Sequence, residues 1–150
     1  VFAYGNIHVS PWEWTADPEV QKILTASRDD SRMFGTQIAF DVPNQDENFP
    51  ELAAYRVAKD LGLRVTTHAG VWGATNDWGI RNAYAAGVME EGFTYVHAAT
   101  LSADSYQKIA ATGGNVSLAT ESEDTCGQGY PPVHQLRKYG IPTSLSVDTS

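Results

Sequence analysis

The stretch DLGLRVTTH, residues 60–68, predicts the end of a helix, a turn and a strand in direct succession. Before it, apolar residues recur at helical spacing over residues 50–61, and Gly62 is the residue type that most often follows the end of a helix. Residues 64–68 are then mainly β-branched, which is typical of a strand. The chain is therefore expected to pass directly from a helix into a strand that ends at His68.

The same alternation of helix and strand continues in both directions along the chain. Strands recur about every 25 to 35 residues, the length of a strand plus a crossover helix, which predicts parallel strands with right-handed connections. Further strands are expected at residues 1–4, 36–41, 94–97, 115–119 and 143–147, and further helices at residues 18–27, 78–86, 102–112 and 132–139.

Two α/β architectures fit this alternation: a doubly wound open sheet and a parallel (β/α) barrel of the TIM type, which needs about 200 residues or more. With six strand units in the sequence, a barrel would be incomplete. No Gly-x-Gly-x-x-Gly motif follows a predicted strand, which argues against a dinucleotide site. A doubly wound enzyme binding a phosphorylated ligand stays open as an alternative, although no glycine-rich loop with a lysine supports it.

Composition limits the function classes. The chain has 150 residues, 42% hydrophobic and 19% charged, which suits one domain over residues 1–150. The net charge of −8 argues against nucleic acid or an anionic membrane as partner. The single cysteine, Cys126, fits a reducing cytoplasm. Because the chain begins inside an apolar run and stops soon after its last predicted strand, we expect a piece of a longer protein.

Three predicted strands end on residue types that bind metals or move protons: His68, His97 and Asp148. In a parallel sheet the carboxyl ends of all strands lie at one edge, so these side chains are expected to converge. Two imidazoles and a carboxylate can hold a cation that activates water, and a carboxylate beside it can take the proton. The alternative is structural: hydrogen-bonded histidines and an aspartate in a turn.

Five segments of the sequence together match the pattern of a known family: residues 61–69, 94–102, 113–118, 120–123 and 139–149. Through them, residues 62–150 resemble the amidohydrolase superfamily, in the branch of chlorohydrolases and aminohydrolases that act on triazines, cytosine and adenosine-like compounds. The first 60 residues match only in general layout. The resemblance implies an incomplete barrel with about strands three to eight present.

The resemblance also implies a function and a site. It makes the parent protein a metal-dependent hydrolase of a non-peptide C–N or C–Cl bond, most simply a deaminase of a small heterocyclic substrate, with zinc or iron as the divalent metal. His68, from the fifth barrel strand, would ligate the metal. His97, from the sixth, would ligate it or orient the water or oxyanion, and Asp148, from the eighth, would ligate it and take the proton from water.

Two departures from the family pattern affect the expected activity. The paired His-x-His of the first strand is absent, since His8 is the only earlier histidine. Many deaminases of this branch carry a glutamate three residues after the fifth-strand histidine, and here that position is Val71. We therefore expect the 150-residue chain to be inactive by itself. The competing hypothesis is a non-catalytic, barrel-derived module that binds a small molecule.

A few other residues are candidates for binding roles. Trp72 follows the fifth strand and could stack on a flat substrate, or only cover the barrel rim. Glu121 and Glu123 follow the seventh strand and could hold a substrate amino group or support a residue of the site from behind. The alternative is a solvated loop, which fits Glu123 better than Glu121. Cys126 has no neighbouring histidine to activate it as a nucleophile. Because an incomplete barrel leaves a strand edge unpaired, the chain is also expected to associate with a second copy.

Overall fold

The computed structural model describes residues 2–4, 15–26, 37–40, 49, 51–71 and 77–148. Helices and strands alternate along them, as the sequence predicts. In chain order the elements are β1 (Phe2–Tyr4), α2 (Pro18–Ala26), β2 (Gln37–Phe40), α3 (Leu52–Leu61), β3 (Arg64–Ala69), α4 (Trp78–Ala85), β4 (Thr94–His97), α5 (Ala103–Ala111), β5 (Asn115–Leu118), α6 (Thr120–Thr125), α7 (Val133–Tyr139) and β6 (Thr143–Leu145).

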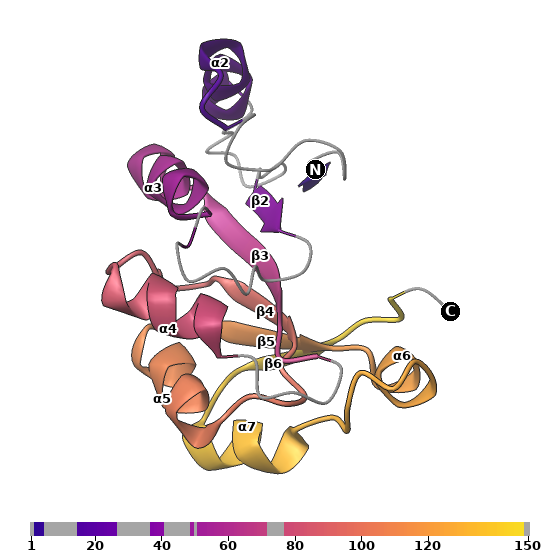
Figure 1. The fold of residues 1–150 in the computed structure, drawn as a ribbon. Helices are drawn as coiled ribbons and strands as arrows, with labels where there is room; N and C mark the ends of the chain where they lie inside the picture. The colour runs from indigo at the N-terminus through magenta and orange to yellow at the C-terminus, as the bar shows by residue number, and fades with distance from the viewer. Residues whose placement is uncertain are drawn as a thin grey trace.

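The six strands of the described residues form one sheet in the order β1-β2-β3-β4-β5-β6, and every neighbouring pair is parallel. Each strand therefore pairs with the next strand in the sequence, without the reversal of order that defines a doubly wound sheet. Helices α3, α4, α5 and α7 lie along one side of this sheet (Figure 1). The predicted incomplete α/β barrel is confirmed, and the doubly wound alternative is wrong.

The two faces of the sheet differ in chemistry. On the helix-covered face, Ile38, Val65, Tyr95, Val116 and Leu118 are buried and form the core with apolar residues of the helices. The opposite face carries mainly small and polar side chains, most of them half-buried. From β2 to β6 they include Ala39, Thr66, Thr94, Asn115, Ser117 and Ser144, which lie side by side on neighbouring strands. Helix packing therefore stabilises the sheet from one side.

Local signals in the sequence fix where the helices begin and end. Ser102 caps α5, since its hydroxyl accepts a hydrogen bond from the Ser105 amide at 3.4 Å. Gly62 ends α3 with a φ of 63°, and Gly140 ends α7 with a φ of 66°. A glycine adopts this left-handed conformation without steric cost, so both predicted helix ends are confirmed.

Helix α6 was not expected from the sequence. No helix or strand was predicted between residues 119 and 132, and the structure has a short helix over residues 120–125, directly after β5. The sequence TESEDT has no apolar residue, so no hydrophobic periodicity signals a helix there. The helix is stabilised at its start by Glu123, whose carboxylate accepts a hydrogen bond from the Ala119 amide at 2.8 Å.

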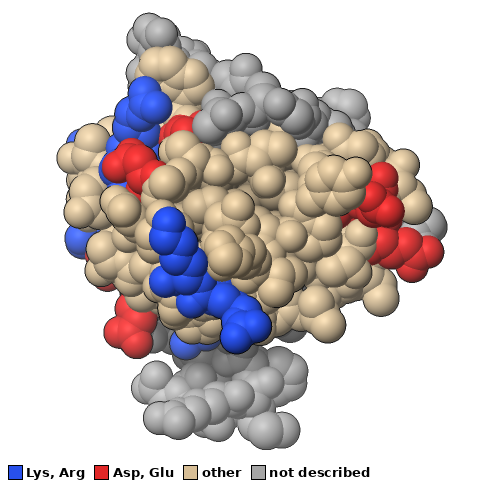
Figure 2. Space-filling view, turned by 90° about the horizontal axis from the view of Figure 1, so that it is seen from below, with Lys and Arg blue, Asp and Glu red and all other residues tan. Residues whose placement is uncertain are grey.

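Charge is unevenly distributed over the surface. Seen from below, acidic side chains gather at the end of the molecule where α6 lies, and Lys and Arg side chains lie nearer the middle (Figure 2). Helix α6 exposes Glu121 and Asp124, while Arg137 and Lys138 are exposed on α7. Among the described residues, no helix is long and apolar enough to cross a membrane.

Gly70, which follows β3, provides a test of how tightly this end of the sheet is packed. Its φ is 59°, and an added Cβ would lie 2.7 Å from Cγ of Leu101 and 3.0 Å from its amide nitrogen. Gly70→Ala is therefore expected to lower the free energy of unfolding by about 2–4 kcal/mol, through backbone strain and overpacking together. Urea denaturation measures the loss.

Gly127→Ala is the matched control, because Gly127 has a φ of 66° but nothing within 4 Å of an added Cβ. It should cost only about 1 kcal/mol from backbone strain. Equal losses for the two variants would contradict the close approach of Leu101 to Gly70.

Candidate active site

The candidate site lies at the carboxyl ends of the strands. His68 is on β3, His97 is the last residue of β4, and Asp148 follows β6. The rings of His68 and His97 stack with centroids 5.3 Å apart and an interplanar angle of 27°. Nε2 of His97 is 3.6 Å from Oδ2 of Asp148. The structure thus brings the three residues together, while their chemical roles stay predictions.

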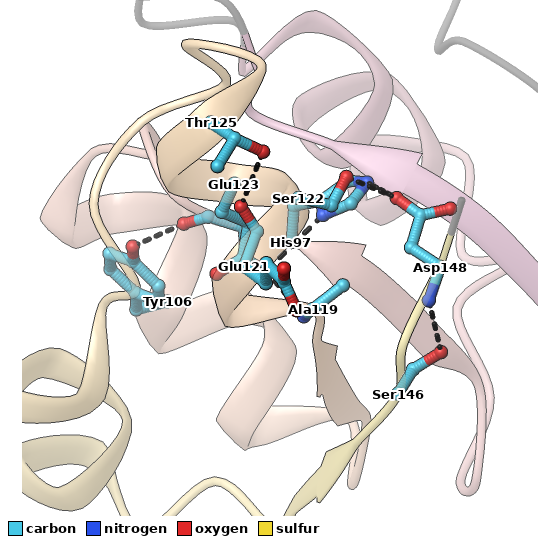
Figure 3. A network of polar contacts seen from close by, with 10 residues as sticks. His97, Tyr106, Ala119, Glu121, Ser122, Glu123, Thr125, Ser146 and Asp148 are labelled. Carbon is cyan, nitrogen blue, oxygen red and sulfur yellow. Dashed lines mark hydrogen bonds and ion pairs between the residues drawn. The ribbon is translucent and has the colours of Figure 1, made fainter. Parts of the chain in front are cut away.

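His97 is held by a second carboxylate. Its side chain and that of Glu123 are both fully buried, and Nδ1 of His97 is 3.2 Å from Oε1 of Glu123 (Figure 3). Glu123 is itself held by the amide of Ala119. On the other side of the ring, Nε2 of His97 is buried and has no hydrogen-bond partner among the described residues. The ring is therefore fixed at one nitrogen and unpartnered at the other.

Three residues at this site that are not glycine adopt the left-handed backbone conformation, with positive φ angles. The φ angles are 70° at His97, 55° at Ala98 and 52° at Asp148, and the only other such residue in the described part of the chain is Phe49. Each such residue costs of order 1–3 kcal/mol, and such residues cluster at functional sites. Strand alternation would direct His97 to the helix-covered face with Tyr95, and the left-handed backbone instead stacks it on His68.

Hydrogen bonds hold this strained segment in place. The amide of Ala98 donates to the carbonyl of Ala69 at 2.9 Å, and the hydroxyl of Tyr106 donates to the carbonyl of Ala98. Tyr106 is 2% exposed, so α5 fixes the peptide directly after His97 from inside the core. Burial raises the pKa of the Tyr106 hydroxyl to about 12, and the nearby charge of Asp77 adds to this, so the hydroxyl stays a donor at neutral pH.

Asp148 is oriented by its own contacts. Its Oδ2 accepts a hydrogen bond from the Ser122 hydroxyl at 2.9 Å, and its amide donates to the Ser146 hydroxyl at 3.2 Å. Ser122 is buried, whereas the Asp148 side chain is 25% exposed. Helix α6 thus contacts both side chains through consecutive residues, Ser122 to Asp148 and Glu123 to His97 (Figure 3).

Asp77 joins the segments that follow the two histidine strands. Its Oδ1 accepts hydrogen bonds from the Ser102 amide at 3.0 Å and from the Ser105 hydroxyl at 2.6 Å. Burial alone would raise the pKa of Asp77, but these hydrogen bonds and the charge of Arg81 outweigh it and hold the pKa below its usual value. The ionised carboxylate therefore stabilises the connection between α4 and α5 at neutral pH.

The donor atoms present fit a divalent metal in part. Two imidazoles and a carboxylate are donors that zinc accepts, and a metal-binding histidine typically donates its other ring N–H to a carboxylate, as His97 can to Glu123. Among the described residues, however, no group of three or more His, Cys, Asp or Glu side chains is close enough to hold a metal ion. The chain therefore presents part of a ligand set.

The sequence also suggested four other residues as candidates for binding or catalysis. Glu121 is exposed on α6, and its predicted contact with substrate stays a prediction. Of the two alternatives for Glu123, the solvated loop is wrong: its side chain is buried against His97, because α6 turns it inward. Cys126 is exposed after α6, and Trp72 lies outside the described residues.

The sequence-based prediction missed the contacts of Ser122 and Glu123. One local signal was available, since Glu123 follows Ala119 by four residues, the spacing at which a carboxylate can reach back to the start of a helix. That signal indicates a helix, but it does not reveal that the carboxylate meets a histidine of another strand.

Comparison with solved structures identifies the fold. Zinc-bound adenosine deaminase from Xanthomonas campestris superposes with a TM-score of 0.67 at 17% identity, over 87% of this chain and 31% of that one. A mutant of atrazine chlorohydrolase from Arthrobacter aurescens, in complex with zinc and atraton, gives 0.64 at 15% identity, over 85% and 31%. Helicobacter pylori aminofutalosine deaminase, in complex with methylthio-coformycin, gives 0.67 at 15% identity, over 98% and 42%.

No protein-family model and no curated protein matches the sequence. The chain spans between 31% and 42% of the length of these three structures. At such low identity the likeness establishes the fold alone, and it confirms the one that the sequence predicts: the chain is part of the α/β barrel on which amidohydrolases such as these deaminases and this chlorohydrolase are built.

Proposed function

We propose that this chain forms part of a metal-dependent hydrolase of the amidohydrolase type, acting on a non-peptide C–N or C–Cl bond of a small heterocyclic substrate. The observation that carries the proposal is the buried His97, with Nδ1 on a carboxylate and Nε2 unpartnered beside Asp148. The fold supports it, since neighbours with this fold include deaminases and a chlorohydrolase solved with zinc or heterocyclic ligands.

The proposed roles follow from the contacts. His68, His97 and Asp148 would hold the divalent metal, zinc or iron, together with ligands that these three residues do not supply. When bound, the metal would lower the pKa of water so that it can attack near neutral pH. Asp148, whose carboxylate accepts a hydrogen bond from Ser122, would take the proton from water and pass it to the leaving group. Nε2 of His97 would orient the water or the developing oxyanion.

Deamination is the reaction we favour, because two of the solved structures with this fold are deaminases. We expect the chain to turn over no substrate by itself, because the sequence has no His-x-His pair to complete the metal site. Hydrolysis by the isolated chain would contradict this.

A non-catalytic module that binds a small molecule is the second candidate. One observation favours it: Val71, at the position where many deaminases of this branch carry a glutamate, is an apolar residue that is 5% exposed. The presence of all three strand-end residues, His68, His97 and Asp148, favours the hydrolase.

Bound zinc would distinguish the two candidates. The purified chain is offered zinc, excess is removed, and bound zinc is measured by elemental analysis. We expect near-stoichiometric zinc that is lost in His68→Ala, because an imidazole ligand is removed. His134→Ala is the control, since His134 is exposed on α7 and lies outside the site. Zinc retained in His68→Ala would contradict the role of His68 as a ligand. Absence of zinc would fit both a hydrolase fragment without its first-strand histidines and a binding module, and the longer sequence would then distinguish them.

We also propose that the chain associates with a second copy through β6. This strand is the last of the sheet among the described residues, so one of its edges has no strand beside it. Leu145 and Val147 are 79% and 81% exposed at this edge. Unpaired edges of this kind are templates for further strand pairing.

A further inference from the structure

We propose that Glu123 is a positioning residue that holds His97 in the tautomer with its proton on Nδ1, so that the lone pair of Nε2 faces Asp148 and the strand-end site. The inference deepens the proposed function, because it assigns which nitrogen of His97 is available to a metal or to water. It concerns a residue that acts through another residue and touches no substrate.

The hydrogen-bond chemistry of Glu123 determines the direction of its contact with His97. Oε1 of Glu123 accepts from the Ala119 amide at 2.8 Å and lies 3.2 Å from Nδ1 of His97. Because this oxygen already accepts a hydrogen bond from an amide, it also acts as the acceptor toward the ring nitrogen. We therefore assign Nδ1 as the donor, and in a neutral ring this leaves Nε2 without a proton.

The unpartnered atoms point to the same tautomer. Nε2 of His97 is buried without a hydrogen-bond partner among the described residues. Its distance of 3.6 Å from Oδ2 of Asp148 is too long for a good hydrogen bond, so no acceptor in the described part of the chain fixes a proton on Nε2, whereas Oε1 of Glu123 fixes one on Nδ1. A lone pair on Nε2 is what a metal or an oriented water requires.

A merely structural role does not account for this arrangement. Burying a carboxylate costs several kcal/mol, and Glu123 has a second oxygen, Oε2, that is buried and unpartnered. The histidine that it holds sits on a left-handed backbone. The buried carboxylate and the left-handed backbone both cost stability, and both fix the same imidazole ring. A carboxylate behind a metal-binding histidine fixes the ring in the same way.

Ring-nitrogen NMR tests the tautomer directly. The chain is labelled with ¹⁵N at histidine, freed of metal, and studied at a pH above the titration of histidine. We expect the wild-type His97 ring to be protonated at Nδ1 and unprotonated at Nε2. Glu123→Gln keeps an acceptor oxygen and should keep this tautomer, whereas Glu123→Ala should allow protonation at Nε2. A wild-type ring protonated at Nε2 would overturn the inference, whatever the variants do.

Zinc affinity, measured by calorimetry, supplies the second readout. Loss of a carboxylate behind a metal-binding histidine typically weakens binding by about 10- to 100-fold, and we expect this for Glu123→Ala, with a smaller loss for Glu123→Gln. Asp124→Ala is the control, since Asp124 is exposed on the same helix. Circular dichroism checks that each variant folds. Unchanged affinity in a folded Glu123→Ala variant would overturn the inference.

The two measurements separate this inference from the proposed function. A wild-type chain that binds no zinc but has Nδ1 protonated would contradict zinc binding by this chain and support the positioning role. A wild-type chain that binds zinc through the site, but whose His97 is protonated at Nε2 in the metal-free form, would support the proposed function and contradict the positioning role.

Discussion

A variant with lysine at both Leu145 and Val147 is expected to stay monomeric at concentrations where the unchanged chain forms dimers. The two side chains are 79% and 81% exposed, and residues two apart on an extended segment share one side. Burying a side chain of this size in a dimer contributes about 1.5–3 kcal/mol. Two buried lysines would remove that contribution and add like-charge repulsion, so association should weaken at least about 100-fold.

Sedimentation equilibrium measures this association over a range of concentrations. Ile23→Lys is the matched control, because Ile23 is 67% exposed on α2 and lies outside the sheet. It should leave the dimer unchanged. A wild-type chain that sediments as a monomer at high concentration would contradict association, and a dimeric double-lysine variant would exclude β6 as the interface.

Phe93→Ala is expected to lower the free energy of unfolding by about 3–5 kcal/mol, the usual cost of removing a buried phenylalanine ring. Phe93 is 1% exposed, and its ring lies 6.3 Å from that of Tyr55 on α3. Its carbonyl accepts a hydrogen bond from the Asn115 amide at 2.8 Å, at the start of β4. A cavity here would loosen the strand that carries His97, and a loss of this size approaches the whole stability of a small domain.

Urea denaturation measures the effect of Phe93→Ala. Tyr130→Ala removes an aromatic ring that is 82% exposed, and it should change the free energy of unfolding by no more than about 0.5 kcal/mol. Similar losses for the two variants would mean that Phe93 does not pack in the core.

Much of the fold could be predicted from local signals. Gly62 and Gly140 end helices because glycine adopts the left-handed conformation, and Ser102 begins one because its hydroxyl caps the first turn. Strand positions followed from β-branched and apolar runs. Helix α6 escaped prediction, since its polar sequence has no apolar face and its stability depends on a contact between Glu123 and the Ala119 amide.

The candidate site was predicted in its residues but not in its contacts. That His68, His97 and Asp148 lie together follows from parallel strands ending at one edge of a sheet. The sequence does not predict that His97 adopts a φ of 70° and stacks on His68. Strand alternation alone would turn the His97 side chain toward the helices. Glu121 and Glu123 differ by two residues, and only the path of α6 decides which of them is buried.

The sequence by itself therefore determined the order of helices and strands, the parallel sheet and the three strand-end residues, because these depend on local propensity and on the geometry common to all parallel sheets. Only the tertiary structure decided that Glu123 holds His97 and that Ser122 holds Asp148. Those contacts join residues 26 apart in the chain, and their partners are set by how the packed elements meet in space.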